Sequence, residues 1–412
     1  MSPVDLVRES LAHIEADREL NAYATVLAGE AFAAAAVAER ELREGRDRGP
    51  LHGLPVALKD NIDTAAVRTT GGSAAYGDRV PARDAECWRL LRDAGAVLVA
   101  KANLHELGYR APHPDFGGVG NPHDRRRTAG GSSSGSGAAV AAGHVVAALG
   151  TDTGGSVRQP AAFCGIVGVK PGRARISRRG LIPLSRSLDA VGVLARDVDD
   201  AEAVLAALIP PGAPARVRAR VGVTPAYDDP DVSAAACGAV ELSARRLAEY
   251  GHDVVEHRLP ELLSTRRLHR AILLGEAHAE HRVVLDRTGP LFRAAVSEGA
   301  RVSRAELAAA LSARERDADA VFGGYDALLL PVTPGVAPPL DPDTGRAAGD
   351  ADLTRWTFIA NLLDVPAASI PVATSEGLPI GVQLVAHRGG EALLLALARA
   401  IFTRVAPPSA VI

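Results

Sequence analysis

The stretch GGSSSGSGAAVAAGHVVAALGTDTGGSVRQP, residues 130–160, contains two glycine- and serine-rich turns joined by small apolar residues. Small side chains allow backbone segments to pack closely. A flexible linker would explain the first turn, GGSSSGSG (130–137). It does not explain the second, GTDTGGSVRQP (150–160), in which charged residues flank the glycines. The stretch therefore predicts that at least the second turn has an ordered place in the fold.

Lys59 stands in a second distinctive segment, GLPVALKDNID (53–63), where it follows an apolar run. Only three of the 46 lysine and arginine residues are lysine. A buried cation is costly to desolvate, but lysine, unlike arginine, can lose its proton and become a neutral base. The pattern indicates either a lysine retained for its chemistry or a surface lysine whose aliphatic stem covers apolar residues.

Predicted helices and strands alternate along the sequence. Residues 4–44 show helical spacing of Leu, Ala and charged residues, and residues 390–403 form a last helix. Short buried strands are predicted at LPVALKD (54–60) and AVLVAKAN (96–103). This alternation is typical of α/β folds.

The bulk composition limits the classes of protein to consider. The chain has 412 residues, 47% of them hydrophobic, which is ample for one large domain or two smaller ones. Two segments, 208–214 and 335–350, resemble linkers, but neither separates an independent core. The net charge is −3 and no basic stripe is present, so we expect no direct nucleic-acid partner. No apolar run is long enough to span a membrane, and the N-terminus does not resemble a signal peptide.

Several residues with possible chemistry have simpler explanations. The cysteines Cys87, Cys164 and Cys237 have no paired spacing, which favours a reducing, cytoplasmic compartment over a disulfide framework or a zinc site. His278 and His281 could form a metal pair, but no third ligand is in sight, so a partly exposed helix face is favoured.

Other residues also have simple explanations. The run Arg125-Arg126-Arg127 (125–127) is expected in a solvated loop. His105, Tyr109 and Phe163 are expected to pack or to shape a pocket, and Cys164 to be a buried thiol.

Generic motifs explain the two turns poorly. Gly131 to Gly135 fits the G-x-S-x-G pattern of a nucleophile elbow, but no late histidine sits in a distinctive loop to complete that site. The chain contains no G-x-x-x-x-G-K-[ST] motif, and the first turn lacks the third glycine of the dinucleotide fingerprint.

The combination of motifs is more specific than each motif alone. KDN after an apolar strand, the GGSS loop and GTDTGGSVR, with 24 residues from Ser132 to Ser156, together resemble the amidase signature family. The similarity continues in order through AGAVLVAKANLHELGY, PAAFCGIVGVKP, YDALLLPVTP and GLPIGVQLV, and it covers residues 5 to 403. It implies one large α/β domain over 1–412, with a mixed sheet covered by helices. The catalytic motifs would lie within 53–196, and 197–412 would be the C-terminal part of the same domain.

The resemblance implies a Ser-Ser-Lys triad at Lys59, Ser132 and Ser156. Ser156 would be the nucleophile, Ser132 would follow a cis peptide bond, and Lys59 would be the neutral base acting through Ser132. The chemistry is sound, because a serine hydroxyl is a weak nucleophile until a base takes its proton, and a bridging hydroxyl can donate and accept at once. Arginine could not replace Lys59 because it would stay charged.

The resemblance also assigns the second turn. The backbone N–H groups of the oxyanion hole would come from Thr153, Gly154, Gly155 and Ser156. Supporting roles would fall to Ser133, which would hold the nucleophile loop, and to an ion pair between Asp152 and Arg158. An ordinary loop salt bridge is the alternative for that pair.

The predicted function is an amidase that hydrolyses a small-molecule carboxamide through a serine acyl-enzyme, with no metal or organic cofactor. A homodimer is the expected assembly. One alternative is the glutaminase (A) subunit of a tRNA-dependent amidotransferase. The chain is shorter than those subunits usually are, and residues 251–324 lack their tyrosine-rich segment. A second alternative is an allophanate or carboxybiuret-type ureido hydrolase, because Ser134 gives the GGSSSGS form of the first turn. A catalytically silent scaffold is the third.

Overall fold

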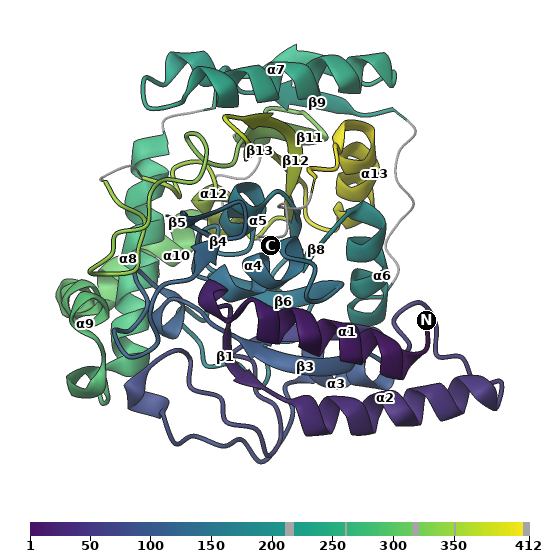
Figure 1. Cartoon of the computed structure of the whole chain (residues 1–412). Coiled ribbons are helices and arrows are strands. Elements are labelled where there is room, and N and C mark those ends of the chain that lie inside the picture. Colours follow the sequence, from purple (N-terminus) through teal and green to yellow (C-terminus); the bar gives the residue numbers. More distant parts are fainter. Residues whose placement is uncertain (211–217, 260–261, 315–320, 350–351, 407–412) are drawn as a thin grey trace.

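A mixed sheet of 11 strands runs through the protein in the order β1-β3-β2-β6-β8-β7-β12-β13-β11-β9-β10 (Figure 1). The computed structural model describes residues 1–412 except 211–217, 260–261, 315–320, 350–351 and 407–412. The strands of this sheet are β1 (Tyr23–Val26), β2 (Pro55–Lys59), β3 (Val97–Ala102), β6 (Ala147–Asp152), β7 (Val167–Lys170), β8 (Ala190–Ala195), β9 (Arg220–Val223), β10 (Asp253–Glu256), β11 (Ala327–Pro331), β12 (Ala367–Ser375) and β13 (Leu378–Ala386). A separate antiparallel pair joins β4 (Gly120–Asn121) to β5 (Asp124–Thr128).

Helices cover both faces of the sheet. They are α1 (Pro3–Ala16), α2 (Ala28–Arg43), α3 (Glu86–Asp93), α4 (Ser134–Ala141), α5 (Arg158–Cys164), α6 (Val198–Leu208), α7 (Ala234–Glu249), α8 (Leu262–His281), α9 (Pro290–Ser297), α10 (Arg304–Arg314), α12 (Phe358–Leu362) and α13 (Glu391–Ile401). The single large α/β domain with a mixed sheet that the sequence predicts is therefore confirmed. No helix within the described residues is long and apolar enough to cross a membrane.

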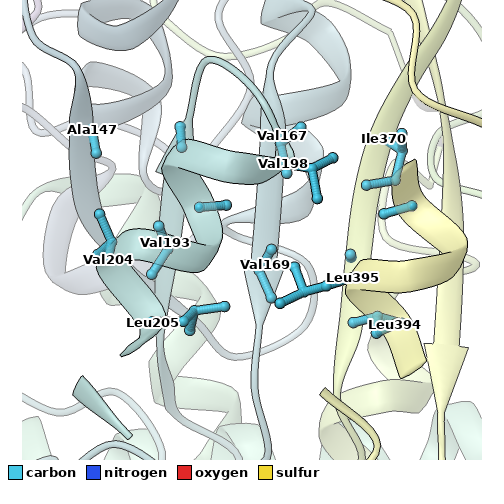
Figure 2. Packing of buried hydrophobic residues seen from close by; sticks show 14 of the residues in the cluster. Ala147, Val167, Val169, Val193, Val198, Val204, Leu205, Ile370, Leu394 and Leu395 are labelled. Carbon is cyan, nitrogen blue, oxygen red and sulfur yellow. The ribbon is translucent and has the colours of Figure 1, made fainter. Parts of the chain in front are cut away.

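Alternating side chains assign the helices to the two faces. In β6, Ala147 and Leu149 join a core cluster that includes Val204 of α6 and Leu394 of α13, whereas Ala148 joins the cluster of α1, α2, α4 and α5. Figure 2 shows the first cluster, in which side chains of α6 and α13 lie over the strands. The strands are buried on both faces, which explains their continuous apolar character.

The second half of the sheet follows the same rule. In β11, Ala327 and Leu329 belong to the cluster with α6 and α13, whereas Leu328 and Leu330 contact the cluster that contains Ile272 of α8. Near β6, this face of the sheet is covered by α4 and α5. Beyond β12, the same face is covered by α8 and α12. The C-terminal ends of β2 and β6 lie near α4 and α8, since Lys59 contacts Ser132 just before α4 and His269 of α8 contacts Thr153 just after β6.

Two local predictions need correction. The helical prediction for 4–44 is confirmed by α1 and α2 but is wrong between them, where the chain takes a left-handed conformation at Asn21 (φ +55°) and adds β1 antiparallel to β3. Edge pairing of the backbone thus overrides the helical spacing of the side chains. The run 125–127 is also no loop: it lies in β5, where only Arg126 is largely exposed and Arg125 forms an ion pair with Asp17 at 2.6 Å.

The linker-like segments have separate outcomes. Segment 208–214 falls mostly on residues outside those described. Segment 335–350, in its described part, is tied to β5 by the bond from Leu340 N to Arg126 O at 2.7 Å, so it is a folded loop. The first Gly/Ser turn also ends sooner than predicted, because α4 starts at Ser134.

Two helical glycines test how closely α4 packs. A Cβ at Gly135 would overlap the Ala22 carbonyl oxygen and lie 2.6 Å from the Asn103 nitrogen, whereas Gly238 in α7 has nothing within 4 Å. Gly135→Ala should therefore lower the free energy of unfolding by about 3 kcal/mol or more. Gly238→Ala should raise it by about 0.5–1 kcal/mol, because alanine favours a helix more than glycine. Urea denaturation measures both, and equal effects would contradict the close approach of α4.

Candidate active site

The candidate site lies where two neighbouring parallel strands end. β2 ends at Lys59 and β6 ends at Asp152, and the strands pair in parallel, with Leu58 opposite Leu149. The turns at 130–133 and 153–157 lie just beyond these ends, at the starts of α4 and α5. The carboxyl ends of parallel strands are a common place for sites, because the loops there converge.

Lys59 is fully buried, so the alternative of a surface lysine is wrong. Its Nζ donates to Ser132 Oγ at 2.7 Å and to Thr151 Oγ1 at 2.8 Å, and it lies 3.4 Å from the Thr151 carbonyl oxygen. Burial lowers the pKa of the Lys59 amine to about 7, although the Asp189 and Asp152 carboxylates act in the opposite direction. Near neutral pH a large fraction of the amine is therefore uncharged, and it can accept the Ser132 proton.

The peptide that precedes Ser132 is held on both sides. The Gly131–Ser132 bond is cis. Gly131 N donates to Gln159 Oε1 at 3.0 Å, and His105 N donates to the Ser132 carbonyl oxygen at 3.1 Å. The His105 ring packs so closely that a Cβ at Gly131 would overlap it. These contacts fix the Ser132 hydroxyl beside Lys59.

Ser133 joins the two turns. Its backbone N–H donates to the Ser156 carbonyl oxygen at 3.1 Å, and its hydroxyl donates to the Thr151 carbonyl oxygen at 3.1 Å. Thr151 N in turn donates to Ser133 Oγ at 3.3 Å. The loop that carries Ser132 is thus hydrogen-bonded to the strand and the turn that lead to Ser156.

Asp152 organises the second turn from within. Its carboxylate accepts bonds from Gly155 N at 2.7 Å and Val157 N at 3.1 Å, and it pairs with Arg158. Burial acts to raise the pKa of the Asp152 carboxyl, but Arg158, the charge of Lys170 and the bond from Val157 N together lower it more, and the net shift is downward. The predicted ion pair is present and fully buried, so it is no ordinary loop salt bridge.

Arg158 has a hydrogen-bond acceptor for each of its five N–H groups. Two of these groups bind Asp152, and the others bind Thr357 O, Asn361 Oδ1 and Gln383 Oε1. Asn361 lies in α12 and Gln383 in β13, so the guanidinium ties the second turn to the C-terminal half of the sheet.

The backbone carbonyls of the second turn are held from outside. His269 Nε2 donates to Thr153 O at 2.9 Å, and Thr357 Oγ1 donates to Gly154 O at 2.6 Å. Burial lowers the pKa of His269 to about 4, so its ring is neutral at pH 7. Gly155 has a φ of +128°, and a Cβ there would overlap Thr357 Oγ1. Only glycine fits this position.

A cavity of about 470 Å³ opens over both turns. Ser132 and Ser156 lie in its wall together with Thr153 and Gly154, whereas Lys59 lies behind the wall. Residues of segment 105–110, of helix α8 and of segments 346–349 and 352–354 also line the cavity. The structure thus places both predicted serines at one cavity and the predicted lysine within hydrogen-bond distance of the first.

Sequence reasoning missed residues that hold these groups. Thr151 and Asp189 contact or face the Lys59 amine, and Asp189 also accepts a bond from Thr153 Oγ1 at 2.6 Å. Gln159 and His269 position the two turns. Thr151 stands two residues before Thr153 in the same motif, which was a usable signal, but nothing in the sequence connects His269 with this site.

The remaining expectations have mixed outcomes. The partly exposed helix face predicted for His278 and His281 holds for His278, which is half-buried. It is wrong for His281, which is buried and donates to Pro183 O at 2.8 Å. Within the described ranges, no group of three or more His, Cys, Asp and Glu side chains could hold a metal ion. Cys164 and Phe163 are buried as predicted, and Tyr109 lines the cavity.

Comparisons with known proteins identify the family of this chain. A solved structure described as an amidase is 35% identical, with a TM-score of 0.89 over 97% of this chain and 95% of the other. The peptide amidase of Stenotrophomonas maltophilia is 30% identical, with a TM-score of 0.85 over 99% and 95%. The glutamyl-tRNA(Gln) amidotransferase (A) subunit of Koribacter versatilis is 36% identical over 93% of this chain and 91% of its own length.

These similarities define the class of protein as a hydrolase that acts on linear amide C–N bonds. The model of the amidase family matches residues 5–395, and the chain belongs to the amidase family.

The buried guanidinium can be tested by a conservative change. Arg158→Lys removes the planar fork and leaves buried acceptors unpaired, so the free energy of unfolding should fall by about 3 kcal/mol or more. Arg196→Lys is the matched control, because Arg196 forms an exposed ion pair with Asp200 at 3.1 Å and should change stability by less than about 0.5 kcal/mol. Similar values for both variants in urea denaturation would contradict a structural role for Arg158.

Proposed function

We propose that the chain hydrolyses a carboxamide to a carboxylic acid and ammonia or an amine through an acyl-enzyme on Ser156. Lys59 is the base and acts through Ser132. The observation that carries this proposal is the 2.7 Å contact between a fully buried Lys59 Nζ and Ser132 Oγ, beside a cavity that Ser156 also lines. No metal or organic cofactor takes part in the proposed reaction.

In the first step the neutral Lys59 amine takes the proton of Ser132, while Ser132 takes the proton of Ser156. The Ser156 oxygen then bonds to the amide carbon, and the carbonyl π electrons move to the oxygen. A base of pKa near the working pH suits this transfer, because it is free to accept the proton and then able to return it. The proton passes back through Ser132 to the nitrogen, the C–N bond breaks and the amine leaves.

The second step reverses the roles. Water loses a proton to the same relay and attacks the acyl carbon, and the Ser156–acyl bond breaks as the acid forms. The Ser156 oxygen recovers its proton through Ser132 and Lys59.

Backbone N–H groups of the second turn are the proposed oxyanion hole. Gly155 N already donates to Asp152. Of the four donors predicted from the sequence, the N–H groups of Thr153, Gly154 and Ser156 therefore remain. The bond from His269 to the Thr153 carbonyl supports this proposal, because it fixes the plane of the peptide that carries the Gly154 N–H. The bond from Thr357 to the Gly154 carbonyl fixes the next peptide, whose Gly155 N–H binds Asp152. One such donor contributes on the order of 10²–10³ in rate.

A second candidate function is the ammonia-supplying component of an amidotransferase. It is favoured by relatives such as the amidotransferase (A) subunit of Koribacter versatilis and that of Anaeromyxobacter sp. (strain K), which is 35% identical over 99% of this chain. That function would require a partner protein. The ureido hydrolase alternative rested on Ser134, which is buried at the start of α4 and is not part of the cavity lining, so Ser134 does not support that alternative.

We also propose a cytoplasmic location. All three cysteines are free thiols, as expected in a reducing compartment. The homodimer predicted from the sequence is also part of this proposal.

The direct test is ammonia release from a panel of amides by the purified chain. The panel contains glutamine, asparagine, malonamide, allophanate, benzamide and phenylacetamide, with Ser156→Ala as the control. We expect turnover of at least one amide, with a loss of about 10³-fold or more in the control. Release that appears only after a partner protein is added would favour the second candidate, and equal release by Ser156→Ala would refute the acyl-enzyme.

The pH dependence follows from Lys59. The base must be deprotonated, so kcat/KM should rise about tenfold per pH unit below the Lys59 pKa of about 7 and level off above it. Lys59→Met, which carries no ionisable group, should lose about 10²–10⁴ in kcat/KM and also lose this limb. Circular dichroism would check that the variant is folded. A flat profile for the wild type across neutral pH would argue against a lysine base.

A further inference from the structure

The cavity over the two serines is rich in arginine. Arg110, Arg266, Arg270 and Arg346 all line it, whereas Asp352 is the single carboxylate among its described lining residues. A concave wall with an excess of one charge attracts the opposite charge, because the low-dielectric protein focuses the field.

Two of these arginines have acidic partners. Arg266 contacts both oxygens of Asp352 at 2.7 Å and the Thr354 hydroxyl at 2.7 Å. Arg270 forms an ion pair with Glu298. Their charges are largely compensated, and they set the shape of the wall more than its charge.

Arg346 differs from these two arginines, because it lies on a turn that backbone hydrogen bonds hold in place without a substrate. Its carbonyl oxygen accepts a bond from Asp341 N at 2.8 Å, and Ala348 N donates to Pro339 O at 2.8 Å. The bond from Leu340 N to Arg126 O anchors the turn to β5. Among the described residues, the half-buried Arg346 side chain has no ion-pair partner. Its charge acts on the Asp341 carboxylate of the same turn without pairing with it, so its guanidinium is available to the cavity.

Arg110 lies in a backbone segment of unusual conformation. Its φ is +69°, and the φ of Leu107 is +49°. A side chain in this region costs of order 1–3 kcal/mol, and such strain persists where the surroundings enforce it. Within the part of the chain that the structure describes, Arg110 also has no acidic ion-pair partner. Its guanidinium is therefore a second cation without an ion pair, on the exposed part of the lining.

The serine end of the cavity carries little charge. Burial, helped by the charges of Lys59 and Arg346, lowers the pKa of His105 to about 3, and burial lowers that of His269 to about 4, so both rings are neutral at pH 7. The Asp152 carboxylate is compensated by Arg158. The cavity thus offers an uncharged end to an amide and a cationic wall to the rest of the substrate.

We infer that this cavity selects amides that also carry a carboxylate, bound by the guanidinium of Arg346 with Arg110 as a second cation. The inference rests on the proposed function, since it specifies the substrate of the same site. A planar guanidinium matches a carboxylate through two parallel hydrogen bonds, which an apolar group of the same size cannot make.

The first test compares substrates that differ only in charge. Succinamate and glutaramate are paired with 4-methylpentanamide and 5-methylhexanamide, in which an isopropyl group replaces the carboxylate. We expect kcat/KM to favour the carboxylate by about tenfold or more. Arg346→Gln should bring this ratio close to one, a loss of about tenfold or more. Arg126→Gln is the matched control, since it removes a mostly exposed arginine of the neighbouring strand outside the cavity, and it should leave the ratio unchanged.

The second test separates this inference from the proposed function. Calorimetry measures binding of the same amides to Ser156→Ala, alone and combined with Arg346→Gln or Arg110→Gln. Carboxylate-dependent binding that is weakened by Arg346→Gln would support the inference even if the wild type hydrolyses none of these amides. Equal binding and equal hydrolysis of both members of each pair would overturn the inference and leave the amidase function standing.

Discussion

The burial of the Lys59 amine is the constraint on which the candidate site depends. An ammonium group without solvent is unstable unless partners compensate for its lost hydration. Lys59 has two hydroxyl partners, Ser132 and Thr151, and the carboxylates that face it, Asp152 and Asp189, lie farther away. This environment keeps the charged and neutral forms close in free energy, which an exposed lysine or any arginine would not do.

A second buried cation explains why the two halves of the chain form one domain. Arg158 follows the glycine turn, yet its hydrogen bonds reach Thr357, Asn361 and Gln383, about 200 residues later in the sequence. The turn that carries Ser156 is therefore shaped by the C-terminal half of the sheet. In the same way Thr357 and His269 hold the two carbonyls beside the proposed oxyanion hole.

The fold class could be predicted from the alternation of helices and strands, and the three triad positions from the resemblance of the motifs to the amidase signature family. The apolar run before Lys59 and the two small-residue turns produce strong local patterns, because a buried strand and a close backbone approach restrict which residues fit. The strand β1 was missed because edge pairing with β3 leaves no apolar alternation to detect. Asp189, His269 and Arg346 were missed because their roles arise from contacts between distant segments, which a single sequence does not encode locally.

The protonation state of Lys59 tests the account most directly. The chain has three lysines, so protein labelled with ¹³C at the lysine Cε gives three signals, and Lys59→Met assigns the one from Lys59. We predict that this signal titrates near pH 7, below the transition of Lys170, whose pKa burial lowers to about 8. A Lys59 amine that stays protonated up to about pH 9 would contradict the neutral base and the proton relay that depends on it.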